Sequence, residues 1–132
     1  MQLKSRTASI NEKTETVFHF LDDLNNYQEL FPKDKISEWE SDKDSCSFKI
    51  KGAASIGFVK KSTEKFSKIS LISGKKSPIK FDLVIDISED SGKTKGGITF
   101  DADVNSFLKM MIEKPLKNLF EHMIDNIEKK FS

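Results

Sequence analysis

Few side chains in this sequence have the chemistry of a catalytic or metal-binding group. The 132 residues include two histidines, His19 and His122, and one cysteine, Cys46. The histidines form no i, i+4 pair and stand at no spacing typical of a histidine–carboxylate metal site. The sequence therefore predicts no metal site, no cofactor and no assigned catalytic residue. Each histidine falls in an amphipathic helical segment, which favours a packing or surface role and leaves a general base open.

The single cysteine excludes an internal disulfide and any zinc site built from cysteines. Cys46 shares its strand face with Phe48 and Ile50, since the three residues alternate with polar ones. A buried cysteine behaves as a small hydrophobic residue, and burial raises the pKa of its thiol. We interpret Cys46 as structural.

Arg6 is the one arginine of the chain, and two interpretations of it are open. In an N-terminal strand it has the parity of Ala8 and Ile10, which would turn it toward the interior. There a guanidinium at a cavity mouth could hold a carboxylate or phosphate with two hydrogen bonds. The alternative is an edge position with the head group in water, which is the commoner situation for arginine.

A run of lysines extends from Lys60 to Lys80. It could contact anionic lipid headgroups or an acidic partner, since each lysine near an anionic surface contributes about 1 kcal/mol. The alternative, which strand alternation favours, is a solvated outer face. The members are Lys60, Lys61, Lys65, Lys68, Lys75, Lys76 and Lys80.

Charge and hydropathy narrow the class of protein. The 22 lysines and arginines nearly balance the 21 aspartates and glutamates, for a net charge of +1. This balance argues against a nucleic-acid-binding protein. The N-terminus lacks the apolar stretch of a signal peptide, and no run of about 18 apolar residues occurs. We expect one cytoplasmic domain, residues 1–132, without a transmembrane segment.

The pattern of apolar residues predicts an α+β domain. Residues 2–10 read as a strand, and residues 11–24 as an amphipathic helix with Asn11 as its N-cap. A second short helix is expected over residues 25–31, ended by Pro32. From residue 36 to 104 apolar and polar residues alternate, which predicts about six antiparallel strands with one face exposed to solvent.

One long amphipathic helix is expected at the C-terminus, over residues 107–130. Pro115 lies inside this pattern, and a proline there removes a backbone hydrogen bond, so we expect a kink. The helix is the one large element that could cover the apolar face of the strands. A strongly curved sheet around a single helix often leaves a hollow between the two.

The element order and two stretches of sequence resemble the SRPBCC, or helix-grip, superfamily, which contains polyketide cyclases, lipid-transfer START domains and Bet v 1-like proteins. The first stretch runs from Ile10 through residues 17–23 to Pro32, and the second covers residues 110–116. The resemblance spans essentially the whole chain and is closest to small bacterial single-domain members. It implies a curved sheet of about six to seven strands around a long C-terminal helix, with two short helices after the first strand. It also implies an apolar cavity for a lipid, sterol, quinone, polyketide or hormone, and it brings no shared catalytic motif.

These observations favour a carrier or sensor of a hydrophobic small molecule held between sheet and helix, as a monomer or weak dimer. The alternatives are a cyclase- or dehydratase-type enzyme on a similar ligand, and a module whose lysine-rich strands contact a protein or a membrane surface. The chain has 11 phenylalanines but one tyrosine, so a cavity lining would offer few proton donors. The predicted ligand-binding residues are strand members of apolar parity, two helix members near the inner stripe, and Arg6 as a candidate anchor: Phe48, Phe58, Phe81, Leu83, Ile98, Phe100, Met111, Leu119 and Arg6.

Overall fold

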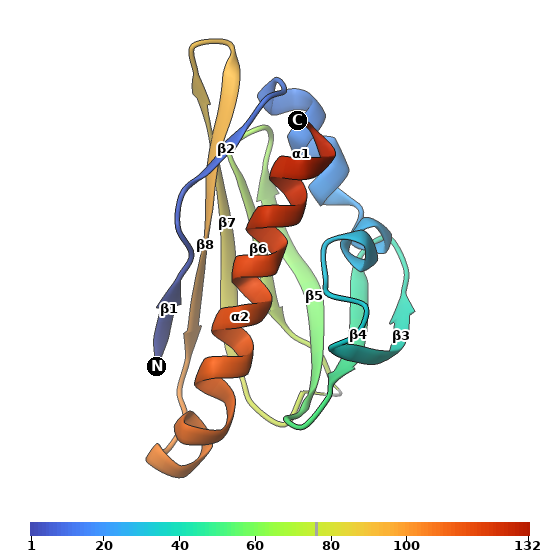
Figure 1. Cartoon of the computed structure of the whole chain (residues 1–132), viewed down its shortest axis with the longest axis vertical. Helices are drawn as coiled ribbons and strands as arrows, with labels where there is room; N and C mark the ends of the chain where they lie inside the picture. Colours follow the sequence, from blue (N-terminus) through green and yellow to red (C-terminus); the bar gives the residue numbers. More distant parts are fainter. Residues whose placement is uncertain (76) are drawn as a thin grey trace.

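The chain folds into a curved antiparallel sheet with one long helix lying across its inner face (Figure 1). This computed structural model describes residues 1–75 and 77–132, so Lys76 of the lysine run lies outside the described residues. The elements are β1 (Gln2–Lys4), β2 (Ala8–Ile10), α1 (Thr14–Asp22), the 3₁₀ helix η1 (Leu24–Glu29), β3 (Ile36–Ser41), β4 (Ser45–Ile50), β5 (Ser55–Glu64), β6 (Lys68–Ser73), β7 (Phe81–Asp90), β8 (Lys93–Ala102) and α2 (Ser106–Lys130).

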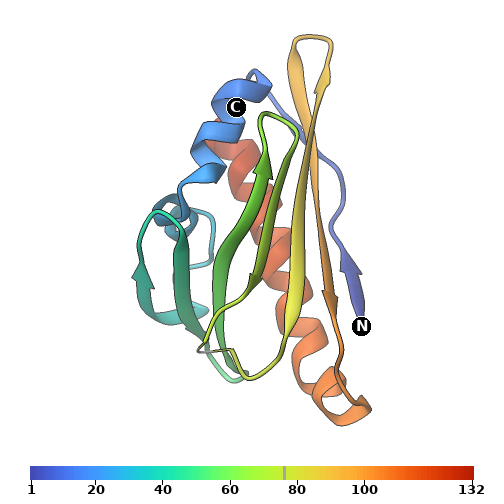
Figure 2. The ribbon, with the colours of Figure 1, turned by 180° about the vertical axis from the view of Figure 1, so that it is seen from behind.

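Strands that are consecutive in the chain from β3 to β8 are neighbours in the sheet. Its eight strands are arranged β1-β8-β7-β6-β5-β4-β3, and β2 pairs with β8 beyond β1. Seen from behind, the strands lie in front of α2, which confirms the predicted grip of a sheet around a helix (Figure 2). The β7–β8 hairpin turns through Ser91 and Gly92, which both have positive φ, at 53° and 81°. A two-residue turn of this kind matches the twist of its strands and favours glycine.

The predicted alternation of the strands is confirmed. In β4 the side chains of Cys46, Phe48 and Ile50 are buried, and those of Phe81, Leu83, Ile85 and Ile87 are buried in β7. Each inward set packs into one core with the inner stripe of α2. Alternation of this kind arises because successive strand residues point to opposite faces of the sheet.

The N-terminal segment differs from the prediction of one strand and a capped helix. Between the pairs Lys4–Thr99 and Ala8–Gly96, three residues on the N-terminal side stand opposite two on β8, so the strand is interrupted by one extra residue. At this break the Ser5 hydroxyl accepts a hydrogen bond from the Ile98 amide at 2.9 Å. Helix α1 begins at Thr14 with Lys13 at the N-cap position and no side-chain cap, so the predicted Asn11 cap is wrong.

Helix α2 is unbroken from Ser106 to Lys130 and passes through Pro115. Its N-terminus is capped by Asn105, whose side-chain oxygen accepts a hydrogen bond from the Leu108 amide at 2.9 Å. The first buried residue of the helix is Ile112. Within residues 1–75 and 77–132 no helix is long and apolar enough to cross a membrane.

Candidate functional site

A row of aromatic rings occupies the space between the sheet and α2. Ring centroids lie 5.6 Å apart for Trp39–Phe48, 5.9 Å for Phe48–Phe58 and 5.6 Å for Phe58–Phe81. The row continues through Phe81–Phe100 at 4.9 Å and ends on α2 with Phe100–Phe120 at 5.4 Å. Neighbouring rings at these separations are in contact, with no room for a further molecule between them. We call this set the aromatic row.

The apolar pocket found within the core lining is small. An apolar pocket of about 30 Å³ lies between the sheet and the C-terminal half of α2, lined mainly by aliphatic side chains of β2, α1, β7, β8 and α2. Such a volume corresponds to about one water molecule. A ligand of the size that proteins ordinarily enclose, at about 300–1,000 Å³, would therefore need the rings or the helix to move.

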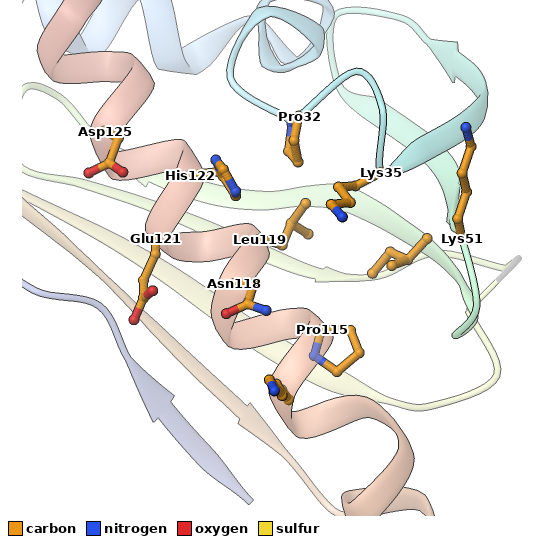
Figure 3. A pocket seen from close by; sticks show the side chains of 11 residues that line it. Pro32, Lys35, Lys51, Pro115, Asn118, Leu119, Glu121, His122 and Asp125 are labelled. Atoms are coloured by element: carbon orange, nitrogen blue, oxygen red, sulfur yellow. The ribbon is translucent and has the colours of Figure 1, made fainter.

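A larger pocket opens at the edge of the core, between α2 and the C-terminal end of β4 (Figure 3). Its volume is about 350 Å³. The buried side chains of Ile50 and Leu119 give it an apolar floor. We call it the mouth pocket; its complete lining is Pro32, Lys35, Ile50, Lys51, Lys114, Pro115, Asn118, Leu119, Glu121, His122 and Asp125.

The rim of the mouth pocket is polar and predominantly basic on the side away from the helix. Lys35 and Lys51 come from the loops that flank β3 and β4, and Lys114 comes from α2. Glu121 and Asp125 place two carboxylates on the helix side (Figure 3). Two larger hollows, of about 670 and 880 Å³, lie on the outer surface with mostly polar linings and do not include α2. The mouth pocket is thus the one among these that joins the surface to the inner face of the sheet.

The polar groups inside the core are already bonded to the backbone. The Thr94 hydroxyl donates to the Glu12 carbonyl at 2.7 Å, and the Tyr27 hydroxyl donates to the Leu21 carbonyl at 2.8 Å. Among the described residues no buried side-chain nitrogen or oxygen lacks a hydrogen-bond partner. Burial raises the pKa of the Cys46 thiol to about 12, so this group is protonated at neutral pH. The interior is therefore suited to apolar contact and offers no free acid or base.

The structure brings most of the predicted ligand-binding residues together. Leu119 lies at the floor of the mouth pocket, whereas Met111 is 48% exposed on the outside of α2. The other predicted apolar residues are buried on the inner face of the sheet, four of them in the aromatic row: Phe48, Phe58, Phe81, Leu83, Ile98 and Phe100.

Arg6 lies on the surface, where its charge is already paired. Its guanidinium donates to Asp125 at 2.6 Å and to both oxygens of Glu128 at 2.6 and 3.0 Å. The Arg6 hydrogen bonds, helped by the Ser9 amide, hold the pKa of Glu128 below its usual value. The inward orientation that strand parity allowed for Arg6 is absent, because the break between β1 and β2 changes the alternation.

The lysine run is divided between the two ends of the molecule. Lys61 and Lys65 lie at the β5–β6 hairpin, whereas Lys75 and Lys80 lie in the β6–β7 connection at the other end (Figure 1). Lys60 is partly buried and bonds Asp22 at 2.9 Å and Asp44 at 3.1 Å. The run is therefore not one patch.

Sequence reasoning missed the loop residues of the mouth pocket, namely Pro32, Lys35 and Lys51. No periodic signal marks them, because they come from separate connections that meet only in the fold. His122 is exposed and lines this pocket, whereas His19 is exposed against the rings of Phe18 and Phe66. Among the described residues no group of three or more histidine, cysteine, aspartate or glutamate side chains could hold a metal ion.

Comparison with solved structures supports the fold. No family model matches the sequence, and no curated protein matches it. A START superfamily protein from Mycobacterium smegmatis has a TM-score of 0.72 at 12% identity, over 98% of this chain and 96% of that one. The Zhui aromatase/cyclase from Streptomyces sp. R1128 has a TM-score of 0.74 at 11% identity, over 98% and 92% of the two chains. Protein Ms6760 from Mycobacterium smegmatis reaches 0.78 at 10% identity, over 99% and 90%. The chain therefore has the START-like helix-grip fold that the sequence predicted.

Proposed function

We propose that this protein binds a hydrophobic small molecule, such as a lipid, a quinone or a polyketide-like compound, between the sheet and α2. The observation that carries the proposal is the mouth pocket, whose apolar floor of Ile50 and Leu119 continues into the core. Its volume of about 350 Å³ lies within the range of ordinary ligand sites. The START-like fold supports the same interpretation.

The bound molecule would enter with its apolar part toward Ile50 and Leu119 and leave its polar end at the rim. Phe48 stands two residues from Ile50 on the same face of β4, so rotation of its ring would extend the pocket along the aromatic row. We retain the buried sheet residues of the predicted set as the inner wall of the site. Met111 and Arg6 are left out, because one is outside the core and the charge of the other is paired.

The expected affinity follows from the apolar surface removed from water. Burying about ten methylene groups contributes roughly 8 kcal/mol of transfer free energy. Association opposes this with about 4 kcal/mol or more. The remainder of about 4 kcal/mol corresponds to a dissociation constant of about 1 mM, which a titration can measure.

The experiment is a titration of the purified protein with decanol, decanoate, a short-chain quinone and an environment-sensitive apolar dye. Asn118 is exposed on the rim, so Asn118→Trp should cover the mouth pocket and weaken binding while the protein stays folded. Lys117→Trp is the matched control, because it adds the same side chain one position away and outside the pocket. If no compound binds, or if both variants bind like the wild type, the proposal is wrong.

A cyclase- or dehydratase-type reaction is the alternative, and one observation favours it. Of the two histidines, His122 lines the mouth pocket, where it could serve as a general base for a bound molecule. Under this alternative His122→Gln would abolish turnover of a polyketide-like substrate and leave its binding intact. Under the carrier proposal the same substitution leaves the recovered ligand chemically unchanged.

A further inference from the structure

The first turns of α2 carry a cluster of exposed apolar side chains. Among the described residues four large hydrophobic side chains are exposed, and three of them are Phe107, Met110 and Met111. Their exposed fractions are 70%, 83% and 48%. Single exposed apolar side chains are ordinary, but a cluster of large ones marks a surface that contacts something apolar.

This cluster projects from the fold. Residues 106–111 precede the first buried residue of α2, Ile112. Of these residues Leu108 packs against the core, whereas the three side chains of the cluster are exposed. Figure 1 shows the start of the helix at the bottom of the molecule, beyond the end of β8. Phe107, Met110 and Met111 share a face of α2 with Lys114, since they lie three, four and seven residues apart. The apolar tip is therefore exposed and directly followed by a cation.

Exposed lysines lie at the same end of the molecule as the tip. Lys109, Lys114 and Lys117 are exposed on α2, and Lys109 pairs with Glu113 at 3.6 Å. The β4–β5 and β6–β7 connections reach the same end of the molecule in both views (Figures 1 and 2). They carry three further exposed lysines, Lys51, Lys75 and Lys80. The exposed acidic residues at this end are Asp82, Asp101 and Asp103. We call the tip and these six lysines the basal surface.

We propose that the basal surface docks on an anionic lipid membrane. Phe107, Met110 and Met111 insert at the boundary between headgroups and acyl chains, and the lysines face the phosphate and carboxylate groups. An apolar tip with lysines at the same end of the molecule is the combination that binds such interfaces. Methionine and phenylalanine suit this role, because methionine is flexible and both are apolar.

A second copy of the chain fits the basal surface less well. Pairing two identical surfaces would bring Lys109 and Lys114 close to their own counterparts, and like charges in contact repel. The tip is also narrow and convex, whereas a stable interface between proteins needs a broad complementary area. An anionic bilayer provides both the apolar layer and the opposite charge.

The docking is independent of the proposed ligand binding, but the two surfaces adjoin. Lys114 belongs to both, and Pro115 of the mouth pocket follows it in α2. A protein docked by its basal surface would hold the mouth pocket beside the membrane. Vesicle binding by a protein that takes up no apolar compound would support the docking and contradict the carrier.

The test is flotation of the full chain with vesicles of phosphatidylcholine, alone or mixed with phosphatidylserine. We expect partition into the mixed vesicles that weakens as salt rises, because salt screens the lysines. Phe107→Ser combined with Met110→Ser should reduce partition by at least about tenfold. Lys109→Gln combined with Lys114→Gln should reduce it by about fivefold per lysine. All four positions are exposed, so thermal melts should stay close to that of the wild type.

Lys61→Gln combined with Lys65→Gln is the matched control, since these exposed lysines lie at the opposite end of the molecule. This variant should bind like the wild type. The proposal is overturned if the wild type ignores mixed vesicles, or if the serine variant binds as well as the wild type. It is also overturned if the wild type binds no vesicles and sedimentation velocity shows that it is a dimer, whereas the serine variant is a monomer. That outcome would identify a second copy as the partner.

Discussion

Replacing Phe48 with alanine should join an internal cavity to the mouth pocket. Phe48 is 2% exposed, and its ring lies 4.7 Å from Phe31 and 5.9 Å from Phe58 between centroids. Ile50, two residues along the same face of β4, belongs to the floor of the mouth pocket. The space left by the missing ring should therefore connect to the pocket.

The cost in stability can be estimated from the burial of this ring. A buried phenylalanine replaced by alanine lowers the free energy of unfolding by about 3–5 kcal/mol. A domain of this size is stable by about 5–15 kcal/mol, so the variant should still fold. Its melting temperature should fall by roughly 10–20 °C.

Decanol should restore part of this loss in Phe48→Ala. A bound ligand raises the free energy of unfolding in proportion to the logarithm of one plus the ratio of its concentration to its dissociation constant, and thermal melts with and without decanol would detect this gain. Phe100→Ala is the matched control, because Phe100 is also buried but is separated from Phe48 by the rings of Phe58 and Phe81. It should lose similar stability and gain no more from decanol than the wild type. Equal gains in the two variants, or none in Phe48→Ala, would refute the proposed path from the mouth pocket into the core.

Three further substitutions or titrations test single contacts. The thiol of Cys46, with a pKa of about 12, should resist a disulfide reagent until the protein unfolds. Since this pKa is raised on folding, its contribution to stability should disappear as pH rises above about 9 toward 12. Glu128→Gln removes one of the two carboxylate partners of Arg6 and should lower stability by less than about 1 kcal/mol, as expected for an exposed pair. The lowered pKa of Glu128 means that this contribution is lost as pH falls below the usual glutamate range, which acid titration of wild type and variant would compare. Pro115→Ala supplies an amide for the Met111 carbonyl and should raise the melting temperature, and decanol titration would report whether the proline shapes the mouth pocket.

The regular part of the fold was predictable because it depends on local periodicity. Alternation placed the inward residues of β4, β7 and β8 correctly, and the helical stripe predicted the long C-terminal helix to within one residue of Ser106. The break between β1 and β2 was missed. It depends on a contact between the Ser5 hydroxyl and the amide of Ile98, and no local pattern reveals a partner so distant in sequence.

The candidate site was predictable only as a set of inward-facing residues. Parity indicated that Phe58, Phe81 and Phe100 point toward α2, and they do. Parity carries no information on the distances between rings, so it could not distinguish a filled core from an empty cavity. That outcome depends on how the sheet curves and where α2 lies. The mouth pocket was missed for the related reason that Lys35 and Lys51 come from different connections.

The polar contacts that hold α2 to the rest of the fold lie at its C-terminal end. Among the described residues, the side-chain hydrogen bonds and ion pairs that join α2 to other elements come from residues 125–130. They are Arg6 with Asp125 and Glu128, the Ser9 amide with Glu128, Asn126 with the Leu30 carbonyl at 2.8 Å, and Lys130 with Glu29 at 3.0 Å.

The half of α2 that contains Pro115 is attached differently. Its inner side chains, from Ile112 to Phe120, contact the sheet through apolar packing. Such packing is non-directional, so it can be re-formed around another apolar molecule. The C-terminal half also packs through Met123, Ile124 and Ile127, and it is in addition fixed by directional hydrogen bonds and ion pairs, which weaken when the geometry changes. Separation of sheet and helix therefore requires less free energy at the end where the mouth pocket and the basal surface lie. A ligand that replaces the lost apolar contacts would stabilise this opening, and the ion pairs of Arg6 would keep the helix in register meanwhile.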